Sequence, residues 1–535
     1  MNIAKRLPLR TLALLCAATG LLAVFPYIPA TRSPNELCRL AQTRSLWDLH
    51  TVEINEVLRA LGRVGDLSRV DTYVLGQRVP HFYPSKAPLL SYLAVPVYAV
   101  LEALHGGGGL RAVPELQLVF FGRLFCTVLP ALLVLWPLRK FLEAHFDEGV
   151  AAALLVSFAL GSVCFAYAEL FMSHGLCAVL LFLTWYALWR HRRGEWGTRN
   201  AFALAGLLAG AAVATEYTAA LALPALAAYG VLTSKKPERL RAVLFGVLGV
   251  LPAVLFLGWY HWRCFGSPLD TGYKHLNDAG YVHWHDHGFL GVGLPEWNAF
   301  WRSFADPLRG LFVVSPFLAL ALPGFFAMKK QLERRPELWL CAAELLLYTY
   351  FTSSFAYDSW GWTTGPRHLT PLVAFMLLPV GEALTWARAK GVAWAGACGG
   401  LLALSVVNMG LLTQVNYISD CVRNGVHRLA LPLALSGHLP NSPLSIAGVP
   451  NPWAWLPEGL ALAGAIAIAI YAMARALRGP TAALVAVGVC VGLFLAHGAI
   501  PPGPDTQCED LTLHNMARDF SPQPGQATRG FWSAP

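Results

Sequence analysis

RAVLFGVLGVLPAVLFLGWY, residues 241–260, contains a single charged side chain in its whole length. An apolar run of about 20 residues is long enough to cross a bilayer as an α-helix. The whole chain shares this character, because 56% of its 535 residues are hydrophobic and only 13% are charged. A soluble globular chain carries about 25% charged residues. Most of the chain is therefore expected to lie in lipid, and its net charge of +9 needs no nucleic-acid partner.

Similar apolar runs recur along the sequence and predict about 13 membrane spans. An open sheet edge in lipid would leave backbone groups unpaired, so each span is expected to be a helix. The predicted fold is an all-α, polytopic transmembrane helix bundle. The predicted spans are 11–29, 116–137, 149–165, 172–190, 200–214, 217–231, 241–260, 309–327, 338–355, 367–386, 391–413, 455–476 and 480–500.

Lysine and arginine favour the cytoplasmic ends of membrane helices, so they orient the predicted bundle. Seven basic clusters can share the cytoplasmic side only if the apolar stretch 87–104 does not cross. This stretch contains Pro88 and Pro96 and is expected to lie along or dip into the outer leaflet. The alternative is that it crosses and several loops break the rule. The clusters are Lys5/Arg6/Arg10, Arg139/Lys140, Arg190/Arg192/Arg193/Arg199, Lys235/Lys236/Arg239/Arg241, Lys329/Lys330/Arg334/Arg335, Arg388/Lys390 and Arg475/Arg478.

This orientation predicts an integral protein of the cytoplasmic (inner) membrane with its N-terminus inside. Residues 1–500 are expected to form one membrane domain, followed by an outward-facing tail, 501–535. The outer loops of this membrane domain are 30–110, 261–308 and 414–454, and the first of them is expected to contain interfacial helices. The run 11–29 is expected to stay as a helix, but a basic start and a short apolar core also fit a cleaved signal peptide. Cys421 and Cys508 both fall outside, so a disulfide between them is possible.

Ionisable residues in or beside membrane spans are costly and mark candidate functional sites. With the orientation above, most of them gather on the outer side, which suggests one outward-facing cavity. Several have a plainer interpretation: a solvated loop charge for Arg39 and Asp66, snorkelling for Arg123, helix capping for Glu216 and packing for His174. The candidates are Glu36, Arg39, Asp66, Asp71, Lys86, Arg123, His174, Glu216, Tyr217, Asp358, Arg367 and His368.

The segment His283-Trp284-His285-Asp286-His287 raises the question of a metal site. In a strand its alternation would place all three histidines on one face. No known metal-site spacing is present, so an interfacial loop rich in His and Trp is the preferred interpretation and no metal ligands are assigned. The sequence also lacks a phosphate-binding P-loop, which argues against an ATP-driven pump. No cofactor is expected, although a divalent cation remains open.

Several segments together resemble a known enzyme family. They are Asn35-Glu36, Phe82-Tyr83-Pro84-Ser85-Lys86-Ala87-Pro88-Leu89, Arg123, Phe265-Gly266-Ser267-Pro268, Arg309-Gly310-Leu311-Phe312-Val313-Val314-Ser315-Pro316 and Arg367-His368-Leu369-Thr370-Pro371. The pattern is similar to the GT-C membrane glycosyltransferases, in the branch of protein O-mannosyltransferases and lipid A aminoarabinose transferases. It looks closest to bacterial glycosyltransferase-like membrane proteins. The chain departs from the family at Asn35, where an acid is usual, and at Ser85, which replaces the acid before the family lysine.

The resemblance implies transfer of a sugar from a polyprenyl-phosphate donor to a glycan, lipid or protein acceptor at the outer membrane face. Glu36 would then be the base that deprotonates the acceptor hydroxyl. Lys86, Arg123 and Arg367 would hold the lipid phosphate by charge-assisted hydrogen bonds. A non-catalytic transporter, flippase or scaffold for lipid-linked glycans is the alternative, because the same cationic cavity could bind cargo.

Overall fold

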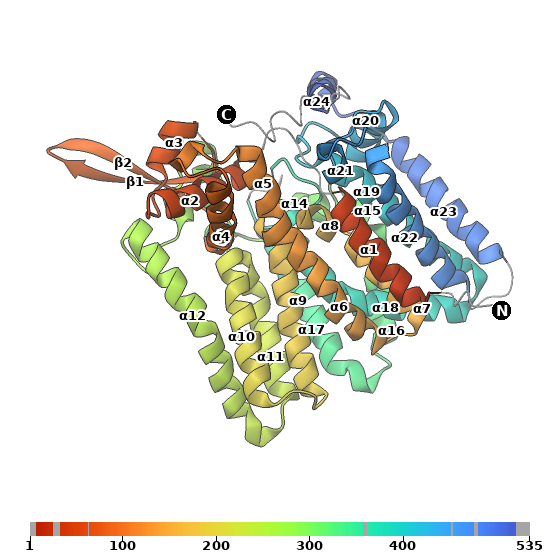
Figure 1. Cartoon of the computed structure of the whole chain (residues 1–535). Coiled ribbons are helices and arrows are strands. Elements are labelled where there is room, and N and C mark those ends of the chain that lie inside the picture. The colour runs from red at the N-terminus through yellow and green to blue at the C-terminus, as the bar shows by residue number, and fades with distance from the viewer. Residues whose placement is uncertain are drawn as a thin grey trace.

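A computed structural model describes residues 7–24, 33–62, 64–356, 361–450, 453–475 and 480–520. Figure 1 shows long helices packed side by side as a bundle. Small elements gather at one end, called the loop end below: α2 (Pro34–Asp48), α3 (Asn55–Leu61), β1 (Leu67–Val74), β2 (Gln77–Pro84) and α24 (Thr506–Asp519). The predicted helix bundle is confirmed, with the addition of one β-hairpin that the sequence did not suggest.

A helix or a run of short helices lies at each of the thirteen predicted stretches, within the described residues. These elements are α1 (Leu9–Val24), α5 (Glu115–Arg123), η2 (Leu124–Val128), α6 (Leu129–Glu143), α7 (Glu148–Leu160), α8 (Val163–Ala168), α9 (Ser173–Arg192), α10 (Thr198–Thr215), η3 (Tyr217–Ala222), α11 (Leu223–Thr233), α12 (Arg239–Phe265), α15 (Leu311–Val314), η6 (Pro316–Leu320), α16 (Ala321–Met328), α17 (Arg335–Ser354), η8 (Arg367–Leu369), α18 (Leu372–Lys390), α19 (Val392–Val415), α22 (Leu456–Ala474) and α23 (Thr481–Gly498). The loops add α4 (Leu89–Leu104), α13 (Ala279–His285), α14 (Trp297–Phe304), α20 (Leu431–Leu435) and α21 (Pro443–Ile446).

Six helical segments are long and apolar enough to cross a membrane on their own. They are Glu115–Glu143, Lys236–Phe265, Leu372–Lys390, Val392–Val415, Trp453–Ala474 and Thr481–Gly498. Shorter apolar helices, such as Glu148–Leu160, pack beside them. Helix α4 packs against α2 at the loop end (Figure 1), and its position along the outer leaflet stays a prediction. The total of 13 crossings stays a prediction.

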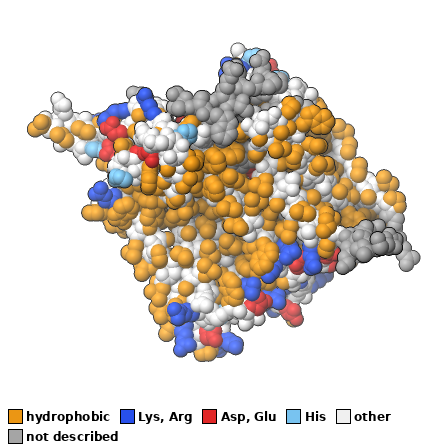
Figure 2. Space-filling view, in the orientation of Figure 1, with side chains coloured by type: hydrophobic (Ala, Val, Ile, Leu, Met, Phe, Trp, Pro, Cys, Tyr) orange, Lys and Arg blue, Asp and Glu red, His pale blue; other side chains and the backbone are white. Residues whose placement is uncertain are grey.

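The described residues of the basic clusters lie at the end of the bundle opposite the loop end. Figure 2 shows lysine and arginine along this edge, beyond a broad hydrophobic band. Arg388 pairs with Asp147 at 2.6 Å, and Arg475 lies 3.8 Å from Glu148. The backbone N–H of Arg10 also donates to Glu148 at 3.4 Å. Clusters far apart in sequence therefore share one end, as the positive-inside rule requires, while the compartment that this end faces stays a prediction.

Helices α10 and α12 approach each other so closely that glycine is required where their backbones meet. A Cβ atom on Gly206 would lie 2.2 Å from the carbonyl oxygen of Gly246. One on Gly249 would lie 2.2 Å from the carbonyl oxygen of Ala203. Small residues commonly allow such close backbone packing between helices in membranes. These glycines allow α12, which runs along the edge of the bundle, to pack closely on α10 (Figure 1).

We expect Gly249→Ala to lower the thermal unfolding temperature in detergent, because the added methyl group overlaps backbone that cannot rotate away. Overpacking of this kind costs about 1–3 kcal/mol. Gly246→Ala in the same helix is the matched control, because its added Cβ would contact only Phe202, at 3.8 Å. Both variants gain the same helix propensity from alanine, so their difference isolates the overlap. Equal unfolding temperatures would contradict the close α10–α12 packing.

The possible disulfide is present: Cys421 and Cys508 are bonded, with their Cα atoms 6.1 Å apart. The bond joins the segment after α19 to α24 at the loop end, across 87 residues of sequence. The other nine cysteines are free and are buried or half-buried. The disulfide thus closes one side of the loop end.

Candidate active site

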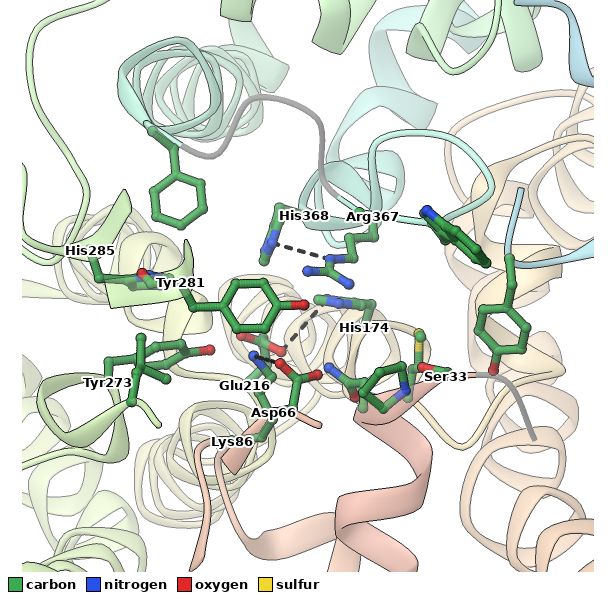
Figure 3. A pocket seen from close by; sticks show the side chains of 18 of the residues that line it. Ser33, Asp66, Lys86, His174, Glu216, Tyr273, Tyr281, His285, Arg367 and His368 are labelled. Carbon is green, nitrogen blue, oxygen red and sulfur yellow. Dashed lines mark hydrogen bonds and ion pairs between the residues drawn. The ribbon is translucent and has the colours of Figure 1, made fainter. Parts of the chain in front are cut away.

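A cavity of about 360 Å³ lies at the loop end of the bundle. Its wall combines the first loop, α9, the turn after α10, the 261–308 loop and the segment that leads into α18 (Figure 3). The charged and histidine side chains in this wall are Asp66, Lys86, His174, Glu216, His285, Arg367, His368 and Asp420. Six of the residues proposed from the sequence therefore meet in one cavity: Asp66, Lys86, His174, Glu216, Arg367 and His368. Their roles stay predictions.

The β-hairpin brings Asp66 and Lys86 together at its base. Because β1 and β2 are antiparallel, the residues before β1 and after β2 are neighbours, and the Ser85 N–H donates to the Asp66 carbonyl at 3.0 Å. Lys86 Nζ lies 3.3 Å from Asp66 Oδ1 and 5.1 Å from the centre of the Tyr273 ring. Burial alone would lower the pKa of Lys86, but the Asp66 carboxylate and Tyr273 raise it above its ordinary value. Lys86 is therefore an ammonium ion at neutral pH.

Asp66 is held in an uncommon backbone conformation. Its φ of +57° lies in the left-handed region, which aspartate tolerates better than most residues. Such strain is maintained only where the surroundings hold it, and it is frequent at functional sites. Among the described residues, Lys86 is the only side chain paired with the Asp66 carboxylate. Its second oxygen can therefore receive a hydrogen bond or a proton from a bound ligand.

Glu216 forms a second acidic position in the cavity, where the chain leaves α10. Its Oε2 accepts a hydrogen bond from the Ser173 hydroxyl at 2.5 Å and lies 3.7 Å from His174 Nδ1. Arg39 donates to Ser173 Oγ at 3.1 Å from behind the wall. Arg39 itself does not line the cavity. Its predicted place in the cavity is therefore wrong, and it acts on the cavity through Ser173.

Arg367 and His368 supply the cationic side of the cavity. Both belong to η8, a single turn that leads into α18, and Arg367 Nε lies 3.4 Å from His368 Nε2. The His368 ring also packs edge-on against His174, with ring centres 5.0 Å apart. In the part of the chain that the structure describes, no carboxylate pairs with Arg367. Its guanidinium is thus available to an anionic ligand.

Glu36, the residue predicted to be the base, does not line the cavity. Its side chain is fully buried, and its two oxygens accept bonds from Arg123 at 2.9 and 2.8 Å. The Phe171 N–H donates to it at 2.6 Å, and the Tyr417 hydroxyl donates as well. Such a carboxylate has its acceptor positions occupied, and Tyr417 rather than Glu36 lines the cavity.

Arg123, which was predicted to hold the donor phosphate, does not line the cavity either. The residue is 1% exposed, and its guanidinium forms a bidentate pair with Glu36. Bidentate pairing of this kind uses the planar fork of donors that a phosphate would need. Glu36 and Arg123 therefore join α2 to α5 as a structural unit.

Two other predicted residues, Asp71 and Tyr217, do not line the cavity. Asp71 lies on the outer part of β1 and pairs with Arg69 at 2.8 Å and with Arg78. The Tyr217 hydroxyl bonds with His261 Nε2 at 2.8 Å and supports the wall from outside. Asp358 lies outside the described residues. The hairpin explains why Asp71 does not lie in the cavity: Asp66 is at the base of the hairpin, next to the cavity, whereas Asp71 lies farther out along β1.

The 261–308 loop contributes side chains that sequence reasoning missed, namely Tyr273, Tyr281 and His285. The histidine-rich segment is helical (α13) rather than extended, so it does not place three histidines on one face. Burial lowers the pKa of His285, which favours its neutral form. Within the described ranges, no group of three side chains could hold a metal ion. The dense His and aromatic content of this loop was the signal that could have pointed to the cavity.

No known family profile matches the chain, and no curated protein matches it. Solved structures with a related arrangement include ArnT from Cupriavidus metallidurans in the apo state, with 14% identity over 96% of this chain and 76% of that chain and a TM-score of 0.46. ArnT bound to undecaprenyl phosphate gives 15% identity over 96% and 77%, with a TM-score of 0.45. The apo oligosaccharyltransferase of Archaeoglobus fulgidus gives 12% identity over 97% and 60%, with a TM-score of 0.46. At these values the likeness assigns no activity, and function must be inferred from the cavity itself.

Proposed function

We propose that this protein is a membrane glycosyltransferase that moves a sugar from a polyprenyl-phosphate donor to an envelope acceptor on the outer face of the cytoplasmic membrane. The observation that supports this most directly is Arg367, a cation without a carboxylate partner among the described residues, in the same cavity as the Asp66–Lys86 pair. An anionic leaving group and a nearby carboxylate base are what the transfer of a phosphate-linked sugar requires.

In this reaction the acceptor oxygen bonds to the anomeric carbon while the bond from that carbon to the phosphate oxygen breaks. The acceptor proton moves to the free oxygen of Asp66, and the lipid phosphate leaves with the bonding electron pair. Arg367 stabilises the charge that develops on the phosphate. Lys86 orients the Asp66 carboxylate through their ion pair and adds a second positive charge near the phosphate. Asp66 thus takes the role that was predicted for Glu36.

Aromatic side chains support a sugar-sized ligand in this cavity. Tyr273, Tyr281 and Trp362 line it, and Figure 3 shows the Tyr281 ring projecting into its centre, between Arg367 and the Asp66–Lys86 pair. The apolar face of a sugar ring packs well against such rings, whose hydroxyl groups can also form hydrogen bonds. A sugar held there would lie between the proposed phosphate anchor and the proposed base.

Arg367→Met is expected to weaken the binding of polyprenyl phosphate by about 2 kcal/mol or more, because it removes a charged partner from a partly desolvated site. Lys86→Met is expected to weaken it less, since Asp66 already balances the lysine charge. Lys274→Met is the matched control, because Lys274 is exposed and pairs with Asp270 outside the cavity. Binding to purified protein can be measured by tryptophan quenching. Equal affinities for all three variants would show that the lipid phosphate does not bind at Arg367 and Lys86.

The proposed function itself is tested by comparing envelope glycolipids and glycoproteins by mass spectrometry. Cells that lack the protein are expected to lose one glycan modification, and the wild-type chain is expected to restore it. The Asp66→Asn variant should fail to restore it at equal abundance in the membrane. Identical envelopes with and without the protein, under conditions where it is expressed, would contradict the proposal. A glycan that Asp66→Asn restores fully would favour the scaffold alternative.

A further inference from the structure

The hairpin β1–β2 ends in an apolar tip that nothing in the described chain covers. Figure 1 shows the hairpin projecting sideways from the bundle at the loop end, beyond α12. At the tip, Leu75 is 100% exposed and Tyr73 is 73% exposed, and Val74 between them is exposed as well. Positions 72–77 carry no charge. Exposed apolar side chains grouped at a protruding end are typical of a surface that contacts an apolar partner.

The backbone at the tip makes this exposure more unusual. Leu75 and Gly76 join the strands as a two-residue turn, with φ values of +51° and +76°. Turns of this geometry favour asparagine, aspartate or glycine at the first position, because a larger side chain is strained in the left-handed region. A leucine at this position strains the turn, and its apolar side chain is unfavourably exposed to water. Burial of the leucine side chain in an apolar medium would offset that cost.

The place of the hairpin indicates which medium this is. Its base packs on the loop end of α12, where the Tyr83 and Phe265 rings meet edge-on at 5.7 Å. Helix α12 belongs to a segment long and apolar enough to cross a membrane, and Trp259 and Trp262 are exposed near its loop end. Exposed tryptophans at the end of a span mark the boundary between lipid and water. The hairpin therefore leaves the protein at this boundary, beside the broad hydrophobic band in Figure 2.

The charged residues of the hairpin lie between its base and its apolar tip. Between the base and the tip, Asp71 pairs with Arg69 on its own strand and with Arg78 on the opposite strand, and Arg78 is the most exposed of the three. An arginine next to an apolar tip can reach lipid phosphates while the tip enters the acyl region. The order along the hairpin is thus cavity, charged middle and apolar tip.

We propose that the tip of the hairpin, Tyr73, Val74 and Leu75, inserts into the bilayer leaflet at the loop end and anchors this wall of the cavity to the membrane surface. Its strands are flanked by Asp66 and Lys86, so the membrane contact and the ion pair belong to one rigid element. The insertion does not depend on the chemistry that the cavity performs. A second copy of the chain bound to the free strand edges is the competing occupant.

The experiment places a nitroxide label at the tip. The full-length Leu75→Cys variant is labelled and reconstituted into vesicles of phosphatidylethanolamine and phosphatidylglycerol. Collisions with oxygen, which concentrates in lipid, are compared with collisions with a water-soluble nickel chelate by electron paramagnetic resonance. Leu511→Cys is the matched control, because Leu511 is an exposed leucine on α24 at the loop end. Labelling of the unchanged chain sets the background, since its free cysteines are buried or half-buried.

We expect the label at position 75 to favour oxygen over the chelate in vesicles, and the label at position 511 to favour the chelate. A label at position 75 that the chelate reaches as easily as it reaches position 511 overturns the insertion. Protection from the chelate in both vesicles and detergent, with two labels close together in one particle, also overturns it in favour of a dimer. Leu75→Asn, which suits the turn better, should leave the unfolding temperature in detergent unchanged or raised, and a lowered one would contradict the cost assigned to leucine at this turn.

Discussion

Asp66→Asn is expected to reduce sugar transfer by roughly two to four orders of magnitude, the usual contribution of a positioned general base. The amide keeps the size and one oxygen of the carboxylate but cannot accept a proton near neutral pH. Because the variant still offers an oxygen to Lys86, the fold and the hairpin base should remain intact. Turnover should therefore fall while the affinity for polyprenyl phosphate changes little. Single-turnover transfer and lipid binding, measured on the same preparation, check both parts.

Asp71→Asn is the matched control, since it makes the same chemical change five residues later, on β1 and outside the cavity. It should retain the wild-type turnover, because exposed ion pairs contribute little. A large loss in Asp66→Asn together with an equal loss in lipid affinity would show that Asp66 serves mainly to hold Lys86. Wild-type turnover in Asp66→Asn would exclude it as the base and make Glu216, another acid that lines this cavity, the next candidate.

The second large effect concerns stability. We expect Glu36→Gln to destabilise the protein by about 3–5 kcal/mol, because it leaves the buried Arg123 guanidinium without its counter-charge. Turnover per folded molecule should stay close to that of the wild type, since Glu36 does not line the cavity. Thermal unfolding in detergent and transfer assays normalised to folded protein separate the two effects.

The Arg123→Gln variant and the double variant complete this test. Each single change strands one buried charge, whereas the double change removes both. The double variant should therefore be less destabilised than the sum of the two single variants, with a coupling of about 0.5–3 kcal/mol. If Glu36→Gln instead folds as the wild type does and loses turnover by orders of magnitude, Glu36 is the base and the pair with Arg123 is not its main role.

Helix positions, and the gathering of the described basic residues at one end of the bundle, could be predicted from the sequence because they depend on local composition. The stretch 241–260 is apolar enough to enter lipid whatever its neighbours are, and it is part of α12. Each basic residue is unfavourable in lipid on its own, so its place at one end of the bundle can be predicted without knowing the tertiary contacts. Lys86 and Arg367 could be selected for the cavity by the same reasoning, since a charged side chain beside a span needs a polar surrounding.

Partners, by contrast, are decided only when distant segments pack. Glu36 and Asp66 look equivalent in the sequence, both acids in one outer loop. Helix packing places Arg123, 87 residues away, against Glu36, and this pairing removes Glu36 from the cavity. The turn of a hairpin sets Asp66 beside Lys86, and a loop two hundred residues later closes the wall with Tyr273. Hydropathy reports the preference of each residue for lipid or water, but whether a buried charge meets a counter-charge or a cavity depends on tertiary contacts, and these decided which acid faces the cavity.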